Sequence, residues 1–404
     1  MNKVTVADIN FRSQRVLVRV DFNVPLDDKQ NITDDSRIKA ALPTLKKILN
    51  DGGKVIACSH LGRPKGKHVP EMSLRPVVKR LSELLGMEVG FAEDCIGPEA
   101  SNVIRKMKDG DCLLLENLRF HDEETKNDPE FAKKLASLGD IYVNDAFGSA
   151  HRAHASTEGV TRYFDQAIAG FLIEKEIKYL GQALTEPKRP FAAILGGAKI
   201  AGKIDVITNL MDKVDLLFIG GGMAFTFAKA MGYQIGNSLV DNEKVELAGE
   251  IIKKVQSSRA KLFFPSDAIV ASEISDNVKT KAVKIDKIPE GMMGLDIGPD
   301  TIKLFKEKLA GCKTIIWNGP MGVFEHKPFA GGTIALAKIL ADLTKHGATT
   351  IVGGGDSAAA VSQAGLEDQL SHISTGGGAS LEFLEGKMLP GIAALTDQIK
   401  VGVV

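Results

Sequence analysis

The chain has 404 residues, of which 44% are hydrophobic, 25% charged and 6% aromatic, the composition of an ordinary globular protein. Lys plus Arg and Asp plus Glu each total 51, so no net charge favours nucleic acid or a membrane surface. We find no signal-peptide apolar region and no apolar stretch near the roughly 20 residues of a membrane helix. We therefore expect a cytoplasmic protein that binds neither nucleic acid nor membrane.

The length exceeds what one hydrophobic core usually serves, so we expect two domains. We predict an N-terminal domain at residues 1–170, an interdomain helix at 171–188 and a C-terminal domain at 189–388. The connecting segment reads as one helix that ends before Pro187 and Pro190. The four scattered cysteines form no Cys-x-x-Cys pair, which indicates buried free thiols.

Short β-rich apolar runs alternate with helical periodicity, the pattern of βαβ units around parallel sheets. The predicted strands are, in chain order, 16–20, 55–58, 112–115, 141–143, 191–195, 216–219, 262–264, 314–317 and 349–352. After the second strand, apolar residues from Leu74 to Leu85 recur at helical spacing and predict a core-facing helix. The predicted fold is two Rossmann-like three-layer α/β/α domains with parallel sheets, joined by the interdomain helix.

Polar and glycine-rich clusters directly follow eight of the predicted strands. In chain order they are DFN, SHLGRP, ENLRF, NDAFGSAHRAH, GGAK, GGG, NGP and GGGD. In open parallel sheets, ligands bind beyond the carboxyl ends of the strands, where loops converge and helix N-termini present their amides. The sequence therefore predicts a ligand site at this edge of each sheet.

Arginine is concentrated in the first half, where eleven of the 13 arginines lie between Arg12 and Arg162. Guanidinium groups bind carboxylate and phosphate bidentately, so a convergent set predicts a small polyanionic ligand. A solvated surface position is the commoner state of any one arginine, but several at successive strand ends favour a site. The candidate residues that we assign to these loops are Asp21, Asn23, Arg37, His60, Arg63, Arg119, His151 and Arg152.

Three Gly-Gly-Gly triplets lie in the second half. The segment Gly197 to Lys203 matches G-x-x-x-x-G-K, but Ile204 stands where a P-loop has Ser or Thr, so we reject a standard P-loop. Lys199 and Lys203 are four residues apart and share a face if a helix begins here. Either these two lysines bind a phosphate chain, or they are solvated on an exposed helix.

The triplet at residues 353–355 precedes Asp356 and an Ala-rich helix. Glycine amides can approach phosphate oxygens, and a carboxylate beside a helix N-terminus can hold magnesium. The later triplet, which follows Thr375, is either a phosphate loop or a hinge. Glu325 can accept hydrogen bonds from a ribose, although an exposed glutamate is the commoner state.

Ten motifs resemble those of the phosphoglycerate kinase family, in the family's order and over essentially the whole chain. They are RVDFNVP, SHLGRP, ENLRF, NDAFGSAHRAH, GGAK, GGGMAFTF, DIGPDT, WNGPMGVFE, GGGDS and STGGGASLE. The resemblance implies reversible phosphoryl transfer between 1,3-bisphosphoglycerate with ADP and 3-phosphoglycerate with ATP, in glycolysis and with Mg²⁺. It further implies a hinge-bending monomer whose tail, residues 389–404, returns to the N-terminal domain.

The resemblance also implies residue roles. The eight candidates of the first half become the triose-acid site. The nucleotide side comprises Lys199, Lys203, Gly221, Asn318, Glu325, Gly353, Gly354, Gly355, Asp356 and Ser357, with Asp356 as the magnesium ligand. Thr375, Gly376 and Gly377 become the phosphate loop or hinge. Gly202 departs from the family, which commonly has an acidic residue there, so a local ion pair is in doubt.

A carboxylate acceptor is already ionised at neutral pH, so this reaction needs no general base. Catalysis then consists of positioning and of neutralising charge on the migrating group, for which Arg37, Lys199, Lys203 and Mg²⁺ are the candidates. Two alternatives stay open: another ATP-dependent ligase or acyl-phosphate kinase, and an inactive scaffold, against which the lysines and Asp356 argue. The sequence does not separate ATP from GTP.

Overall fold

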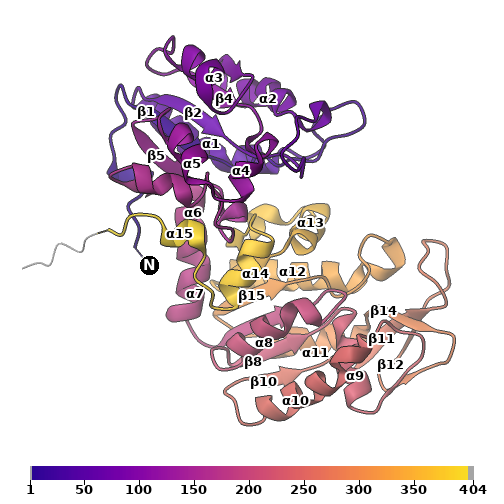
Figure 1. Ribbon diagram of the computed structural model, residues 1–404. Helices are drawn as coiled ribbons and strands as arrows, with labels where there is room; N and C mark the ends of the chain where they lie inside the picture. Colours follow the sequence, from indigo (N-terminus) through magenta and orange to yellow (C-terminus); the bar gives the residue numbers. More distant parts are fainter. Residues whose placement is uncertain (1, 399–404) are drawn as a thin grey trace, which may run out of the picture. The chain divides into compact units, whose positions relative to one another are not determined.

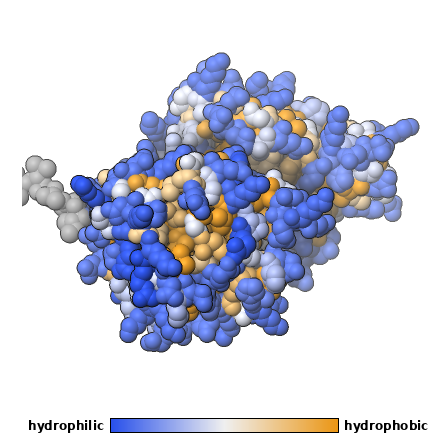
Figure 2. All heavy atoms as spheres, turned by 90° about the horizontal axis from the view of Figure 1, so that it is seen from above, coloured by the Kyte–Doolittle hydropathy of each residue, from blue (hydrophilic) through white to orange (hydrophobic). Residues whose placement is uncertain are grey.

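The computed structural model describes residues 2–398, which fall into two compact units (Figure 1). The first unit runs through Lys178 and resumes at Met388, and the second runs from Tyr179 to Lys387. Among the described residues, no helix is long and apolar enough to cross a membrane. Figure 2 shows mainly hydrophilic side chains on the visible face, with hydrophobic residues gathered in patches between them.

Unit one is built on a six-stranded parallel sheet in the order β3-β4-β2-β1-β5-β6. Its strands are β1 Arg15–Arg19, β2 Lys54–Cys58, β3 Val89–Ala92, β4 Cys112–Leu115, β5 Ile141–Asn144 and β6 Ala167–Ala169. The central strands are buried almost throughout, as parallel strands covered on both faces must be.

Helices flank this sheet (Figure 1). They are α1 Ser36–Asn50, α2 Arg75–Leu85, α3 Gly97–Ile104, α4 Asp122–Thr125, α5 Pro129–Ala136, α6 Phe171–Glu176 and α15 Pro390–Ala393, with 3₁₀ turns at Val6–Asp8, Pro70–Met72, Leu118–Phe120, Phe147–Ser149 and Gly159–Tyr163. Local sequence sets their ends: α2 has a proline in its first turn and stops at Gly86, whose φ of 72° is left-handed. Buried Val77 and Leu81 form the core side of α2.

The end of the described chain returns to unit one. The Val4 amide donates to the Thr396 carbonyl at 2.9 Å, and the Thr396 amide donates to the Ala167 carbonyl at 2.9 Å. Lys3 forms an ion pair with Asp397 at 2.7 Å. Residues 399–404 of the predicted tail lie outside the described residues.

Unit two has a second six-stranded parallel sheet, in the order β10-β8-β7-β15-β16-β17. Its strands are β7 Phe191–Leu195, β8 Leu216–Ile219, β10 Lys261–Phe263, β15 Thr314–Asn318, β16 Thr349–Gly353 and β17 His372–Ile373. A small antiparallel sheet joins β11 Asp267–Ala271, β12 Lys281–Lys284 and β14 Met293–Ile297, and β9 Gln234–Ile235 pairs with β13 Lys287–Ile288.

The helices of unit two are α7 Gln182–Thr185, α8 Ile204–Leu210, α9 Met223–Ala230, α10 Val245–Val255, α11 Pro299–Leu309, α12 Gly331–Lys345, α13 Gly355–Gln363 and α14 Gly378–Leu384. Short 3₁₀ turns lie at Ala201–Lys203, Asn242–Lys244, Lys327–Phe329 and Glu367–Gln369. Between α6 and α7 the chain forms a π-helical segment, Ile177–Gly181.

The predicted fold of two parallel-sheet α/β domains is confirmed, and each of the nine predicted strands lies within one residue of an observed strand at both ends. All four cysteines are buried and free, as predicted. The single helix predicted before Pro187 is instead α6, the π-helical segment and α7. The antiparallel sheet was not predicted. Its edge strand β12 is largely exposed and begins and ends with lysine, which is not the buried apolar run by which the other strands were recognised.

Candidate functional site

The first half-site is a cationic pocket of about 440 Å³ in unit one. It is lined by Arg63, Lys65, Gly66, Arg119, His121, Asp122, Thr125, Arg152 and His154. These residues come from the loops after β2, β4 and β5, which end at the same edge of the sheet. Three of the four predicted arginines therefore share one pocket.

The side chains of Arg119 and Asn23 both form hydrogen bonds with the backbone of Gly62, in the loop after β2. Arg119 Nη1 donates to the Gly62 carbonyl at 2.7 Å, and the Gly62 amide donates to Asn23 Oδ1 at 2.9 Å. The buried Nε of Arg119 has no hydrogen-bond partner among the described residues. A buried guanidinium donor without a partner fits a site that receives an anion.

Arg37, the fourth predicted arginine, is not in a loop as we expected. It is the second residue of α1, and its Nη1 donates to Asp21 Oδ2 at 2.7 Å. Arg37 was assigned to the loop after β1. It lies well beyond the end of that strand, however, and α1 already begins at Ser36. The Asp21 carboxylate is buried, so it fixes one edge of the half-exposed guanidinium.

His60 lies among these cations. Burial, together with the charges of Arg19, Arg119, Arg37 and Arg152, holds its pKa well below the ordinary value, so the imidazole is neutral. The same causes, burial first and then Arg19 and Arg152, lower the pKa of Arg119 to about 10. Such effects require short distances between the arginines, and they indicate positive charge that an anion would relieve.

Arg19, which the sequence analysis did not single out, supports this pocket from below. It is fully buried, donates from Nε to Ser156 Oγ at 2.8 Å and lies 3.1 Å from His60 Nδ1 through Nη2. Buried Glu124 accepts from the same Ser156 hydroxyl at 2.6 Å. Its place in the motif RVDFNVP was a signal, but its position within a strand indicated core.

His151, another predicted residue, contacts an arginine that lines this pocket. Arg152 Nε donates to His151 Nε2 at 3.1 Å. His154 and Lys65 also line the pocket, and sequence reasoning missed both, although each lies in or next to a quoted motif. The pKa of His154 is lowered to about 3 by burial and then by Arg119, Arg19 and Arg152, so this histidine is neutral too.

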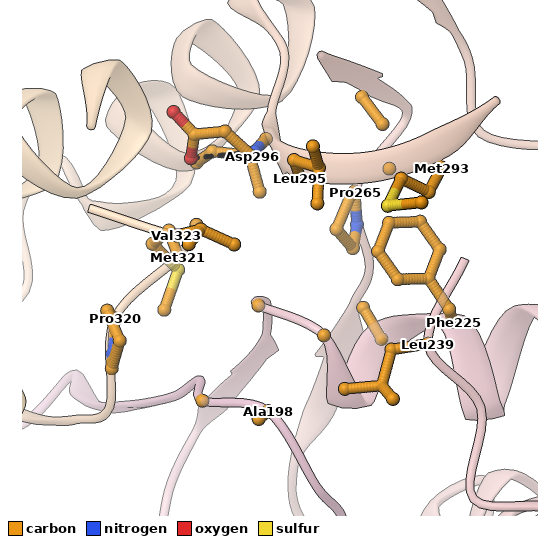
Figure 3. A pocket seen from close by; sticks show the side chains of 18 of the residues that line it. Ala198, Phe225, Leu239, Pro265, Met293, Leu295, Asp296, Pro320, Met321 and Val323 are labelled. Atoms are coloured by element: carbon orange, nitrogen blue, oxygen red, sulfur yellow. Dashed lines mark hydrogen bonds between the residues drawn. The ribbon is translucent and has the colours of Figure 1, made fainter. Parts of the chain in front are cut away.

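The second half-site is a cavity of about 400 Å³ in unit two (Figure 3). Its walls are largely apolar: Phe225, Leu239 and Met293 lie on one side, and Pro320, Met321 and Val323 on the other. Glu325, Asp356 and the buried Asp296 supply carboxylates. A mostly apolar cavity with a few polar groups is typical of a small-molecule site and fits a flat heterocycle.

Glycines let three loops meet at one edge of this cavity. A Cβ atom at Gly221 would lie 2.5 Å from the Gly197 amide nitrogen, and one at Gly319 would lie 2.4 Å from the Gly196 carbonyl oxygen. Both glycines have left-handed φ angles, 64° and 97°. No larger residue fits there, so backbone amides of the GGAK, GGG and NGP loops come close together.

Lys203 approaches this junction from the side. Its Nζ donates to the Asn318 carbonyl at 3.0 Å and also contacts the Asn318 side-chain oxygen. Burial lowers its pKa to about 8, against the opposing effect of Asp356. The buried Nδ2 of Asn318 has no hydrogen-bond partner among the described residues and faces Gly353 and Gly354. Both donors are available to an anionic ligand.

The condition under which Lys199 and Lys203 would share a helix face is not met. Helix α8 begins only at Ile204, and Lys203 ends a 3₁₀ turn. Lys199 is exposed and is not among the described residues that line the cavity.

The loop after β16 places a helix N-terminus beside the cavity. Gly354 has a φ of 90°, and α13 begins at Gly355 with Asp356 in its first turn. The exposed Asp356 carboxylate lines the cavity, and its oxygens beside a helix start suit Mg²⁺. Ser357 is buried, and its hydroxyl accepts from the Gly319 amide at 2.7 Å, which ties this loop to the NGP loop.

The third glycine triplet precedes α14. Gly377 has a left-handed φ of 48°, and the Gly376 amide donates to Ser374 Oγ at 3.2 Å. Ser374 Oγ in turn lies 2.6 Å from Ser380 Oγ. These bonds give the Thr375 loop a defined shape, which is compatible with both the phosphate-loop and the hinge interpretation.

A cluster of arginines lies at one parallel sheet, and at the other lies a glycine-lined cavity with carboxylates in its wall and Lys203 beside its glycine junction. Together they define a two-domain α/β phosphotransferase. The family model described as Phosphoglycerate kinase matches residues 6–387. The chain belongs to the phosphoglycerate kinase family.

Relatives agree over almost the full length. The chain is 61% identical to phosphoglycerate kinase of Chlorobium limicola and 62% identical to that of Chlorobium phaeobacteroides, each over 397 residues, 98% of this chain and 100% of the relative. Among solved structures, phosphoglycerate kinase from Coxiella burnetii is similar with a TM-score of 0.88 and 43% identity, covering 97% of this chain and 98% of that one. The enzyme from Pyrococcus horikoshii has a TM-score of 0.85 and 34% identity, with the same coverage.

Proposed function

We propose that this chain catalyses reversible phosphoryl transfer between 1,3-bisphosphoglycerate with ADP and 3-phosphoglycerate with ATP, a step of glycolysis. Full-length identity of about 60% to proteins of that name supports the proposal. The structural observation that carries it is the partnerless buried Nε of Arg119 in a pocket shared with Arg63 and Arg152. Such a pocket fits a ligand with both a phosphate and a carboxylate.

In this proposal the cationic pocket holds the acid substrate. Arg63, Arg119 and Arg152 bind its phosphate and neighbouring oxygens, while Asp21 and Asn23 accept from or orient its hydroxyl. Neutral His60 donates or accepts one hydrogen bond without adding charge. Arg37, held by Asp21 at 2.7 Å, would stabilise the reacting carboxylate.

The cavity of unit two holds the nucleotide in this proposal. The apolar walls enclose the base, Glu325 accepts from the ribose, and the amides around Gly221 and Gly353–Gly355 lie close to the phosphate oxygens. Asp356 would hold Mg²⁺, which neutralises phosphate charge when bound. Lys203 and Lys199 add positive charge to the transferring group, and Thr375 to Gly377 cover a phosphate.

The chemistry needs no proton transfer, because the carboxylate acceptor is ionised at neutral pH. An oxygen of that carboxylate attacks the γ-phosphorus while the bond to the ADP oxygen breaks, and the charge spreads over the migrating oxygens. Arg37 and Lys203 stabilise that charge. The family's hinge bending, a monomeric state and a cytoplasmic location complete the proposal, and they rest on family membership alone.

Coupled ATP consumption with 3-phosphoglycerate and Mg²⁺ tests the function. We expect turnover with this acid and none with acetate or glutamate. Activity only with another acid would favour a different acyl-phosphate kinase, and no activity with any acid would favour a scaffold. GTP in place of ATP measures the nucleotide preference in the same assay.

A further inference from the structure

A cluster of three possible metal ligands lies in unit one, apart from the proposed magnesium site. Asp94, Cys95 and His121 each offer one ligand atom, and these atoms lie within 4.8 Å of one another. Among the described residues this is the one group of three that meets that criterion. None of the three has a role in the phosphoryl transfer proposed above.

The fold brings these residues together from two loops. Asp94 and Cys95 follow β3, whereas His121 lies between the 3₁₀ turn Leu118–Phe120 and α4. His121 Nε2 lies 2.7 Å from Asp94 Oδ1, and their side chains are 28% and 36% exposed. Cys95 is 1% exposed. A cation that arrives from solvent therefore meets the carboxylate and the imidazole first and finds the thiol behind them.

An ordinary ion pair accounts for Asp94 and His121, but it leaves Cys95 unexplained. The thiol is in no disulfide, and it is buried. Apolar packing alone would explain a buried thiol anywhere in the core. Here its sulfur adjoins a carboxylate and an imidazole, the two other side-chain types that bind zinc.

We propose that Asp94, Cys95 and His121 form a binding site for a divalent cation of intermediate softness, such as Zn²⁺. Thiolate and imidazole select Zn²⁺ or Co²⁺ over Mg²⁺, which prefers oxygen ligands only. Tetrahedral zinc holds such ligands about 3.3–3.8 Å apart, so small side-chain movements close the cluster. Cys95 releases its thiol proton to solvent on binding, His121 binds as neutral imidazole, and water completes the fourth position.

Metal binding at this site should also affect the cationic pocket. His121 lines that pocket and follows Arg119 by two residues in the chain. A cation that draws His121 towards Cys95 moves the turn that presents Arg119, so Zn²⁺ should weaken binding of the acid substrate. This consequence rests on the proposed function, whereas metal binding itself does not.

Titration of the full chain with Co²⁺ tests the site directly, because thiolate ligation gives a charge-transfer band in the near ultraviolet. We expect one equivalent of Co²⁺ with this band, displaced by Zn²⁺ and not by a large excess of Mg²⁺. Cys95→Ser should abolish the band, and His121→Asn should weaken binding about tenfold or more. Two matched controls should leave the titration unchanged: His346→Asn at an exposed histidine beside Asp342, and Cys312→Ser at another buried thiol.

The proposal is overturned if wild-type protein shows no charge-transfer band with Co²⁺, or if the band persists in Cys95→Ser. Binding that is lost equally in the His346→Asn control would show adventitious binding by surface histidines. Circular dichroism checks that each variant is folded, and His121→Asn provides the test if Cys95→Ser is not. Absence of phosphotransferase activity would leave the Co²⁺ result unaffected, so the two proposals fail separately.

Discussion

The ammonium group of Lys203 lies 3.0 Å from the carbonyl oxygen of Asn318, where β15 ends. This contact holds a cation beside the glycine junction of the GGAK and NGP loops. Because the ammonium is poorly hydrated there, its pKa is lowered to about 8, and a ligand phosphate would stabilise its charged form. The first two predictions depend on this relationship.

Replacing Lys203 with alanine should lower kcat about 100- to 1,000-fold, because a positioned donor to the transition-state charge is lost. Lys306→Ala, at an exposed lysine of α11, is the matched control and should leave kcat unchanged. Thermal unfolding should show that both variants are folded. Wild-type turnover in a folded Lys203→Ala protein would remove Lys203 from the mechanism.

The same lysine predicts an alkaline limb in the pH profile. Its charged form is lost as pH rises through about 8, so kcat/KM, which reports the free enzyme, should fall above that pH. Lys203→Arg keeps its charge at all these pH values and should lack the limb, whatever its absolute rate. Profiles of both proteins between pH 6.5 and 9.5 make the comparison, and an unchanged limb in the variant would assign it to another group.

Substitution of Arg63 should act on the other half-site. Arg63→Ala should raise the KM for 3-phosphoglycerate about tenfold or more and change the KM for ATP little, since a charge-assisted hydrogen bond contributes about 1.5–3 kcal/mol. Arg105→Ala, at an arginine whose guanidinium donates to Asn102 and which does not line the cationic pocket, is the control. Equal KM values for the acid in both variants would argue against the assigned role.

Most of this fold was predictable, since buried parallel strands such as β7 and β15 are continuous apolar runs. Residues of the strand-end motifs likewise line the cationic pocket of unit one and the cavity of unit two. Arg19 was missed because its position inside a predicted strand indicated a core residue, although it lies in the motif RVDFNVP. The apolar cavity wall was missed for a related reason: Phe225 and Leu239 come from segments whose proximity depends on tertiary packing.

For the two lysines, by contrast, a clear local pattern was present, but the observed structure does not follow it. Lys199 and Lys203 have the i, i+4 spacing of one helix face, yet the helix starts only at Ile204. Lys203 is the last residue of the 3₁₀ turn Ala201–Lys203, whereas Lys199 lies before that turn. Spacing predicts a shared face only where the helix is already established.

Replacing Asp356 with asparagine should raise the Mg²⁺ concentration needed for half-maximal activity about tenfold or more, because an amide is a weaker ligand than a carboxylate. Asp368→Asn, at an exposed aspartate of the turn Glu367–Gln369, should leave the Mg²⁺ dependence unchanged. Activity measured against free Mg²⁺ at saturating nucleotide separates the two. An identical Mg²⁺ dependence in Asp356→Asn would place the metal elsewhere.

The last prediction concerns stability and a buried carboxyl group, Asp145. Its Oδ1 accepts from the Leu172 amide at 2.8 Å in the first turn of α6, and burial raises its pKa from 3.8 to about 7. The folded state therefore holds this proton more tightly than the unfolded state. Its contribution to stability is complete below about pH 3.8 and is lost as pH rises through about 7.

In the Asp145→Asn variant this proton uptake is absent, so the decrease in the free energy of unfolding that Asp145 contributes as pH rises from about 4 to 7 should be lost, and the slope against pH should become more positive. The slope should change by at most about 1.4 kcal/mol per pH unit, the value for one proton. Urea unfolding at pH 5, 6 and 7 measures it, with Asp212→Asn at an exposed position as the control. Buried Asp296, whose pKa is also raised to about 7, remains in the variant, so part of the wild-type slope should persist. Parallel curves for wild type and Asp145→Asn would mean that Asp145 is already ionised across this range in the folded protein.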